Sequence, residues 1–323
     1  MRNLLGLLML FPIAATSTQA GDQGVDPNVV PHAATGAEPA APAEFPRAEA
    51  LIETDALAKL IAVRDANLVV IDARGEETYA AGHISGARNI PSDPFQDPGN
   101  LPYFLANTQT MKGVCAEAGI NSDSRVVIYD DDDGRLAARV WFTLHAYGHD
   151  RVAILNGGSG KWRNERREWV TDASLPAKGA FEPADKLRGV CTFDDLPQFN
   201  TRVHTIGTLP TVTLIDARSL AEYMGEELRG KVGGHIPGAA NMEWCNVLTA
   251  PVNNRVWRSA PEIHAILRMA GIDRMQKIAI YDQAGGRSAH VYFTLWLMGF
   301  EHAYNYVGGW REYAKKDGVE IER

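Results

Sequence analysis

The feature that most constrains the fold is an internal repeat, because the chain of 323 residues returns to the same pattern after about 150 residues. VVIDARGEETYAAGHISGARNI (69–90) matches TLIDARSLAEYMGEELRGKVGGHIPGAANM (213–242). VVIYDDDDGR (126–135) matches IAIYDQAGGR (278–287), and VAILNGGSGKW (152–162) matches AYNYVGGWREY (303–313). This period is too long for a solenoid, so the sequence predicts a duplicated domain.

Each copy alternates short apolar runs with longer amphipathic stretches. The runs at 68–74, 126–130 and 152–156 are rich in β-branched residues, as expected of buried parallel strands. Helix-like stretches occur at 46–64, 137–148, 260–272 and 288–299. Gly148 and Gly299 stand where a helix stop is favoured. The alternation predicts an α/β fold of two tandem domains, each a mainly parallel sheet flanked by helices.

Domain limits follow from the repeat and from local composition. We expect domain 1 at 47–170, a linker at 171–190 that lacks apolar periodicity, and domain 2 at 191–323. Residues 1–20 resemble a secretory signal peptide, with Arg2, an apolar stretch and small residues up to Ala20. A buried N-terminal helix is the alternative. Residues 21–46, rich in Pro, Ala and Gly, read as a flexible leader. The expected location is periplasmic or secreted.

Composition also argues against several partner classes. The net charge of −8 and the lack of a long basic run disfavour nucleic acid. The N-terminal apolar stretch is too short for a membrane span, so no membrane association is expected after signal cleavage. The three cysteines, Cys115, Cys191 and Cys245, lack metal or redox spacing, and no cofactor motif is present. We expect no metal and no cofactor. One disulfide bond is possible, but the sequence does not specify which two cysteines would form it.

The repeated motifs carry a family resemblance. IDAR (71–74 and 215–218), AGHISGA (81–87), GGHIPGA (233–239), the two loops that follow the YD pairs, and the NGGSGKW and VGGWREY segments recur in order. Together they resemble the tandem-domain rhodaneses, the thiosulfate or 3-mercaptopyruvate sulfurtransferase family, over residues 47–320. The resemblance implies two rhodanese-like domains. It also implies a sulfur-transfer loop in the second domain.

The loop of the second copy departs from that family at its first residue. In active members this residue is a Cys whose thiolate carries sulfane sulfur as a persulfide. Here Asp282 takes the slot, followed by Gln283, Ala284, Gly285, Gly286 and Arg287. The first copy has Asp130 in the slot, followed by Asp131, Asp132, Asp133, Gly134 and Arg135. First domains of the family are usually inactive, so the resemblance implies that neither loop presents a sulfur nucleophile.

A carboxylate in this slot has a structural use. Successive N–H groups in a tight loop, followed by a helix N-terminus, form an anion site. We expect Asp282 to fill this site itself through charge-assisted hydrogen bonds, with Arg287 as a partner. Covalent aspartyl chemistry would need a metal or clustered cations, and only Arg287 is evident nearby in the sequence. A residual anion- or ligand-binding role stays open.

The acidic run Asp130–Asp133 and the cysteines have alternatives as well. The run lacks the ligand spacing of an EF-hand loop, so a solvated turn ended by Gly134 is favoured over a calcium site. Cys245 follows GGHIPGAANMEW, a segment that runs near the active site in this fold, yet nothing around it indicates a stabilised thiolate. We expect all three cysteines to be structural.

Two histidines and two tryptophans recur at matching positions of the repeat. We expect His83 and His235 to serve the fold by bonding the strand ends near Asp72 and Asp216. Trp162 and Trp310 are predicted core aromatics after the last strand of each copy.

The sequence therefore predicts an exported rhodanese-like protein without sulfurtransferase activity. Its expected work is binding, either of a small anion or sulfur-containing compound or of a periplasmic protein. The cleft between the domains beside 282–287 is the expected place. The alternatives are an active thiosulfate or 3-mercaptopyruvate sulfurtransferase that uses another residue, and a purely structural partner of another periplasmic enzyme.

Overall fold

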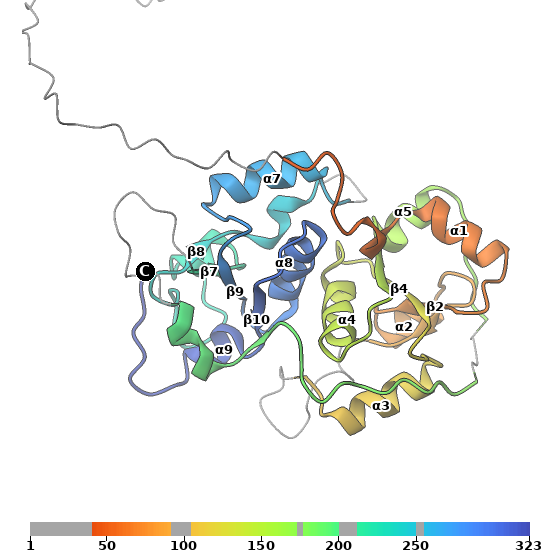
Figure 1. Ribbon diagram of the computed structural model, residues 1–323, viewed down its shortest axis with the longest axis horizontal. Coiled ribbons are helices and arrows are strands. Elements are labelled where there is room, and N and C mark those ends of the chain that lie inside the picture. Colours follow the sequence, from red (N-terminus) through yellow and green to blue (C-terminus); the bar gives the residue numbers. More distant parts are fainter. Residues whose placement is uncertain (1–40, 92–104, 173–176, 200–211, 250–254) are drawn as a thin grey trace, which may run out of the picture. The chain divides into compact units, whose positions relative to one another are not determined.

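The computed structural model describes residues 41–91, 105–172, 177–199, 212–249 and 255–323 (Figure 1). The predicted signal peptide and the leader up to residue 40 lie outside these ranges. Within them the chain forms two five-stranded sheets, each built from one copy of the repeat. Both sheets are parallel and both are flanked by helices, which confirms the predicted fold class.

The first sheet has the strand order β1-β5-β4-β2-β3. Its strands are β1 (Leu51–Ile52), β2 (Leu68–Asp72), β3 (Arg88–Asn89), β4 (Arg125–Tyr129) and β5 (Val152–Leu155). The central strands are apolar on both faces, because helices cover both sides of a parallel sheet. β1 pairs only with Ile154 and Leu155, so the first half of β5 has no neighbour from β1.

The second sheet repeats this order as β6-β10-β9-β7-β8. Its strands are β6 (Val190–Cys191), β7 (Val212–Asp216), β8 (Ala240–Asn241), β9 (Lys277–Tyr281) and β10 (Ala303–Tyr306). The registers match those of the first sheet: Val127 lies beside Ala153, and Ala279 lies beside Tyr304. β6 begins at Val190, the last residue of the segment predicted as a linker.

The helices follow the predicted alternation. In the first domain they are η1 (Ala48–Ala50), α1 (Thr54–Ala62), α2 (Glu76–Ala80), α3 (Thr108–Glu117), α4 (Arg135–Ala146) and α5 (Gly158–Asn164). In the second they are η3 (Phe193–Phe199), α6 (Leu220–Tyr223), η4 (Trp244–Val247), α7 (Ala260–Met269), α8 (Gly286–Leu297) and α9 (Gly309–Tyr313). The helices predicted within 137–148, 260–272 and 288–299 are confirmed. Gly148 and Gly299 follow α4 and α8 with positive φ, as a helix stop requires.

The stretch 46–64 is not one helix, which corrects the prediction made for it. It begins with η1, continues as β1 and becomes helical only from Thr54. Leu51 and Ile52 are apolar in either conformation, so the local pattern does not separate a helix from a strand. Pairing with Ile154 and Leu155, far along the chain, selects the strand.

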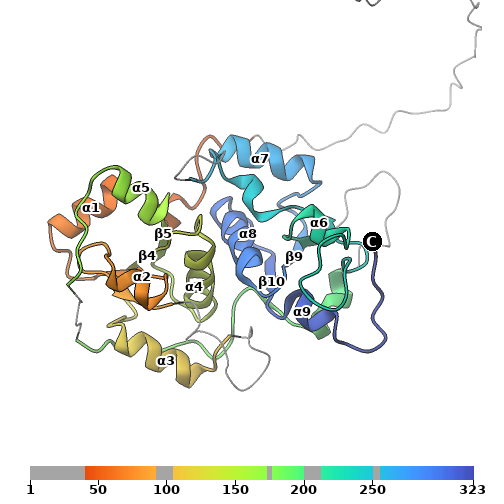
Figure 2. The same cartoon turned by 180° about the vertical axis from the view of Figure 1, so that it is seen from behind.

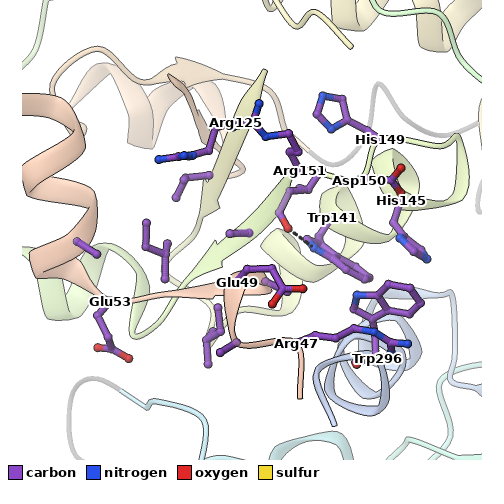
Figure 3. A pocket seen from close by; sticks show the side chains of 18 of the residues that line it. Arg47, Glu49, Glu53, Arg125, Trp141, His145, His149, Asp150, Arg151 and Trp296 are labelled. Atoms are coloured by element: carbon purple, nitrogen blue, oxygen red, sulfur yellow. Dashed lines mark hydrogen bonds between the residues drawn. The ribbon is translucent and has the colours of Figure 1, made fainter. Parts of the chain in front are cut away.

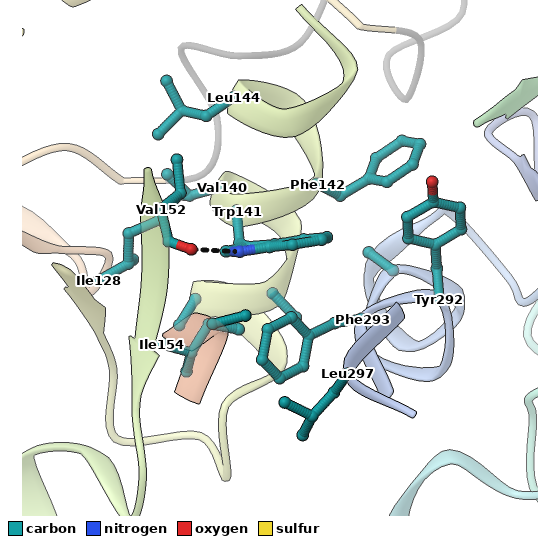
Figure 4. Packing of buried hydrophobic residues seen from close by; sticks show 14 of the residues in the cluster. Ile128, Val140, Trp141, Phe142, Leu144, Val152, Ile154, Tyr292, Phe293 and Leu297 are labelled. Atoms are coloured by element: carbon teal, nitrogen blue, oxygen red, sulfur yellow. Dashed lines mark hydrogen bonds between the residues drawn. The ribbon is translucent and has the colours of Figure 1, made fainter. Parts of the chain in front are cut away.

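The two domains meet through α4 and α8, which lie side by side between the sheets (Figures 1 and 2). Residues 137–146 of α4 are all buried, as expected of a helix that packs against its own sheet and against a second helix. Figure 4 shows the Trp141 ring between β5 and the aromatic face of α8. The Trp141 and Phe293 rings meet edge-on with their centroids 4.9 Å apart, and the centroids of the Phe142 and Tyr292 rings are also 4.9 Å apart.

The connections from strand to helix differ in length between the copies. Residues 130–134 join β4 to α4, whereas residues 282–285 join β9 to α8. The second connection is therefore one residue shorter, and α8 begins at Gly286 rather than at Arg287. Counted from the first residue of each helix, Arg139 corresponds to His290, and Trp141 corresponds to Tyr292.

Candidate anion-binding loop

Asp282 lies at the end of β9 with its carboxylate turned into its own loop. Oδ1 accepts hydrogen bonds from the backbone N–H of Ala284 at 3.0 Å and from that of Gly285. Oδ2 accepts from the N–H of Arg287 at 2.8 Å, and the Ser288 hydroxyl donates to Oδ1 at 3.2 Å. The residue is 3% exposed. The loop therefore forms the expected anion cradle, and the Asp282 carboxylate occupies it.

Arg287 sits at the rim of the cradle and makes its main pair elsewhere. Its Nη2 donates to Glu222 Oε1 at 2.9 Å, while its Nε lies 3.7 Å from Asp282 Oδ2. Burial alone would raise the pKa of the Glu222 carboxyl, but Arg287, Arg229 and the Ser219 N–H together outweigh it, and the pKa falls. Arg229 also pairs with Glu222, at 3.2 Å, and its carbonyl accepts a bond from Gln283 Nε2. The predicted pair with Asp282 is present but secondary.

Helix α4 of the first domain closes the other side of the loop. The Arg139 guanidinium donates from Nη1 to the Gly285 carbonyl at 3.1 Å. Burial lowers the pKa of Arg139 to about 10, and the charge of Asp282 acts in the opposite direction. A Cβ on Gly286 would lie 3.3 Å from Arg135 Nη1. Sequence reasoning missed Arg139, although a buried Arg in the apolar run 137–148 is a signal that could have found it.

The loop of the first domain has the same arrangement and a cover. Asp130 accepts from the N–H groups of Asp132 at 3.1 Å, Gly134 at 2.9 Å and Ala137 at 2.8 Å. Burial raises the pKa of Asp130 to about 6, against the effect of these N–H groups. The ring of Trp257 lies directly against Gly134. Asp130 is thus buried, which corrects the prediction of a solvated turn; Asp131 is exposed as predicted.

Two further residues of the acidic run, Asp132 and Asp133, pair with cations. Asp132 pairs with Arg135, and Asp133 lies 3.4 Å from Arg255. Among the described residues, no group of three or more His, Cys, Asp or Glu side chains is arranged to hold a metal ion.

None of the three cysteines forms a disulfide. Cys115 and Cys191 are buried, and burial raises the pKa of each thiol to about 12. Cys245 is partly exposed, and burial together with the charge of Glu243 raises its pKa. A raised pKa reduces the thiolate fraction on which nucleophilicity depends.

The recurring histidines have a structural role, but with different partners from those predicted. His83 Nδ1 lies 3.0 Å from the Tyr79 carbonyl, and His235 Nδ1 lies 3.0 Å from that of Tyr223. The arginines of the two IDAR motifs hold the strand ends instead: Arg74 pairs with Asp72 at 2.5 Å, and Arg218 with Asp216 at 2.5 Å. Trp162 and Trp310 are buried, as predicted.

Comparison with known proteins agrees with this architecture. A family model for the rhodanese-like domain matches residues 53–165 and 201–316. The chain belongs to the rhodanese-like family. Its curated relatives include the sulfur carrier protein TtuD of Thermus thermophilus, 30% identical over 76% of this chain and 87% of that protein. A thiosulfate sulfurtransferase of Azotobacter vinelandii is 29% identical over 79% of this chain and 91% of that enzyme.

Solved structures share the rhodanese-like fold at lower identity. An anaerobic ergothioneine biosynthesis enzyme from Chlorobium limicola superposes with a TM-score of 0.73 and 22% identity. The match covers 86% of this chain and 71% of that enzyme, and at this identity it speaks for the fold alone. Within the described ranges, the chain has no helix with the length and apolar character needed to cross a membrane.

Proposed function

We propose that this rhodanese-like protein does not transfer sulfur through its second-domain loop and instead acts by binding. The observation that carries the proposal is the Asp282 carboxylate held by three backbone N–H groups of that loop. A carboxylate forms no persulfide. Because it already fills the cradle, it also repels a second anion such as thiosulfate.

The cysteines offer little support for an alternative nucleophile. The thiols of Cys115 and Cys191 are buried and have pKa values of about 12. Cys245 is the most accessible of the three, but its pKa is raised as well. Sulfur transfer by thiol–disulfide-type attack needs a thiolate that the donor can reach.

We propose that the partner is an anionic or sulfur-containing compound or a protein, and that it meets the rim of the loop rather than its floor. Gln283 and Ala284 are partly exposed there, next to the Arg287–Glu222 pair. We also propose export, on the pattern of residues 1–20. Mass spectrometry of the protein recovered from the exported fraction tests export: a chain that still begins at Met1 contradicts it.

An active sulfurtransferase remains the second candidate, since curated relatives at 27–30% identity are named thiosulfate sulfurtransferase or sulfur carrier protein. The deciding assay supplies thiosulfate with cyanide, and 3-mercaptopyruvate with a thiol, to the purified mature protein. We expect no more thiocyanate or sulfide than from the Cys115→Ser/Cys191→Ser/Cys245→Ser variant.

Intact mass after exposure to thiosulfate gives an independent readout. We expect no added sulfur atom on the wild-type chain. A sulfur adduct that disappears in Cys245→Ser alone would overturn the proposal and assign the chemistry to that thiol.

A further inference from the structure

A pocket of about 650 Å³ opens at the edge of the first sheet, away from the loop of Asp282 (Figure 3). It exists because β1 pairs with only the second half of β5, so Val152 and Ala153 border the open space on both faces of the sheet. We call it the edge pocket. Its volume lies within the range of small-molecule sites, about 300–1,000 Å³.

One end of the edge pocket is cationic. Arg125 begins β4 and Arg151 immediately precedes β5; the backbone N–H of Val126 donates to the Arg151 carbonyl, so these residues are neighbours across the sheet. Figure 3 shows both guanidinium groups at the same end of the pocket, with Glu53 at the opposite end. Arg125 lies 3.4 Å from Asp65, but in the described part of the chain no carboxylate pairs with Arg151. This end therefore carries uncompensated positive charge.

Three carboxylates also line the pocket, those of Glu49, Glu53 and Asp150, and the last two have partners of their own. Glu53 accepts from Asn156 Nδ2 at 2.6 Å and from Lys161 at 3.1 Å. Asp150 pairs with Arg188 at 2.8 Å. One polar atom of the lining lacks a partner: His149 is 1% exposed, and its buried Nδ1 has no hydrogen-bond partner among the described residues. Such an atom is costly unless something pairs with it.

The second domain indicates what fits the space. By strand register, Arg125 corresponds to Lys277 and Ala153 corresponds to Tyr304. The Lys277 ammonium lies 5.5 Å from the centroid of the Tyr304 ring and 5.1 Å from that of Phe199. In the second domain, aromatic rings of the chain thus lie beneath the cation, a favourable arrangement. The first domain has Ala153 at that position, and the space beside it is the pocket.

We propose that the edge pocket binds a small aromatic anion, with its ring against Ala153 and its acidic group between Arg125 and Arg151. The ring replaces the contact that Tyr304 makes in the second sheet, and a planar carboxylate suits the planar donor groups of arginine.

The test uses naphthalene-2-carboxylate as probe and naphthalene-2-carboxamide as its uncharged isostere, measured by titration calorimetry on the whole mature protein. Trp141 and Trp296 line the pocket, so quenching of tryptophan fluorescence gives a second signal. We expect saturable binding of the carboxylate and an affinity for the amide weaker by about tenfold, as loss of a charge-assisted contact implies. Equal affinity for the two probes, or no carboxylate binding at millimolar concentration, overturns the proposal.

Variants locate the site. Ala153→Tyr installs the residue that the second sheet carries, and it should abolish binding by filling the space. Arg151→Glu changes an exposed residue, so it leaves the fold intact, and it should lower the affinity for the carboxylate by at least about tenfold. His302→Ala and Lys277→Ala, the matched positions of the second domain, should leave the affinity unchanged. Binding that survives Arg151→Glu, or that falls equally in Lys277→Ala, refutes the assignment.

Discussion

Replacing Asp282 by alanine tests directly whether the carboxylate holds its loop together. The substitution removes the acceptor of three backbone N–H groups, those of Ala284, Gly285 and Arg287. A donor left unpaired costs about 1–3 kcal/mol when buried. Gly285 is buried while Ala284 and Arg287 are partly exposed, so water can reach two of the three donors. The buried donor then costs about 1–3 kcal/mol and each of the other two about 0.5–1.5 kcal/mol as a lost hydrogen bond, so we expect Asp282→Ala to lower the free energy of unfolding by about 2–6 kcal/mol.

Urea denaturation with and without formate gives the assay. Formate supplies the two oxygen atoms that the variant lacks, so it should stabilise Asp282→Ala by about 1.4 kcal/mol at ten times its dissociation constant. The wild-type protein should gain nothing beyond the general salt effect, because its cradle is filled. Asp130→Ala is the matched control: it loses a similar set of bonds, but Trp257 covers the loop and formate should not enter.

Two results would refute the reasoning. A loss of stability below about 1 kcal/mol would mean that the N–H groups do not depend on the carboxylate. Equal stabilisation of wild type and Asp282→Ala by formate would mean that the cradle is not occupied by the side chain.

Further predictions concern Asp130, Asp282 and Arg139. The pKa of Asp130 is raised from its ordinary value to about 6, so the folded state holds this proton more tightly than the unfolded chain. The free energy of unfolding of the wild type, relative to that of Asp130→Asn, should therefore fall by up to about 3 kcal/mol as the pH rises from about 4 to about 6. Urea denaturation at each pH measures this difference. A pH-independent difference would contradict this. Asp282→Cys should place a thiolate among the same N–H groups, and we expect a measurable gain of thiocyanate formation over wild type; a folded but inactive variant would show that substrate contacts are absent too. Arg139→Met should lower the free energy of unfolding by about 2–3 kcal/mol in the wild type, and by less when Asp282→Asn is also present. Strictly additive effects in this double-mutant cycle would argue against the electrostatic link between Arg139 and Asp282.

Much of the fold could be predicted from the repeat and from local pattern. β2, β4 and β5 are continuous β-branched runs ended by polar residues, and such runs indicate buried parallel strands without further information. Asp282 could be placed at the head of an anion cradle because strand, short loop and helix follow one another directly in sequence.

The misses share a physical cause, which is that the deciding contact lies far away in the chain. β1 is a strand only because of Ile154 and Leu155. Arg139 belongs to the second-domain loop only because α4 packs against α8. Asp130 is buried in its own loop, and Trp257, from the other domain, lies over Gly134 of that loop. Local periodicity contains none of this information.

The burial of α4 on every side has a consequence for how this protein can change over time. The first domain alone would expose Phe142 and its aromatic neighbours to water. The second domain alone would expose Tyr292 and Phe293. We therefore expect either domain alone to aggregate or to associate with a second copy of itself. The apolar contact between α4 and α8 therefore favours keeping both domains in one chain, whatever chemistry either loop performs.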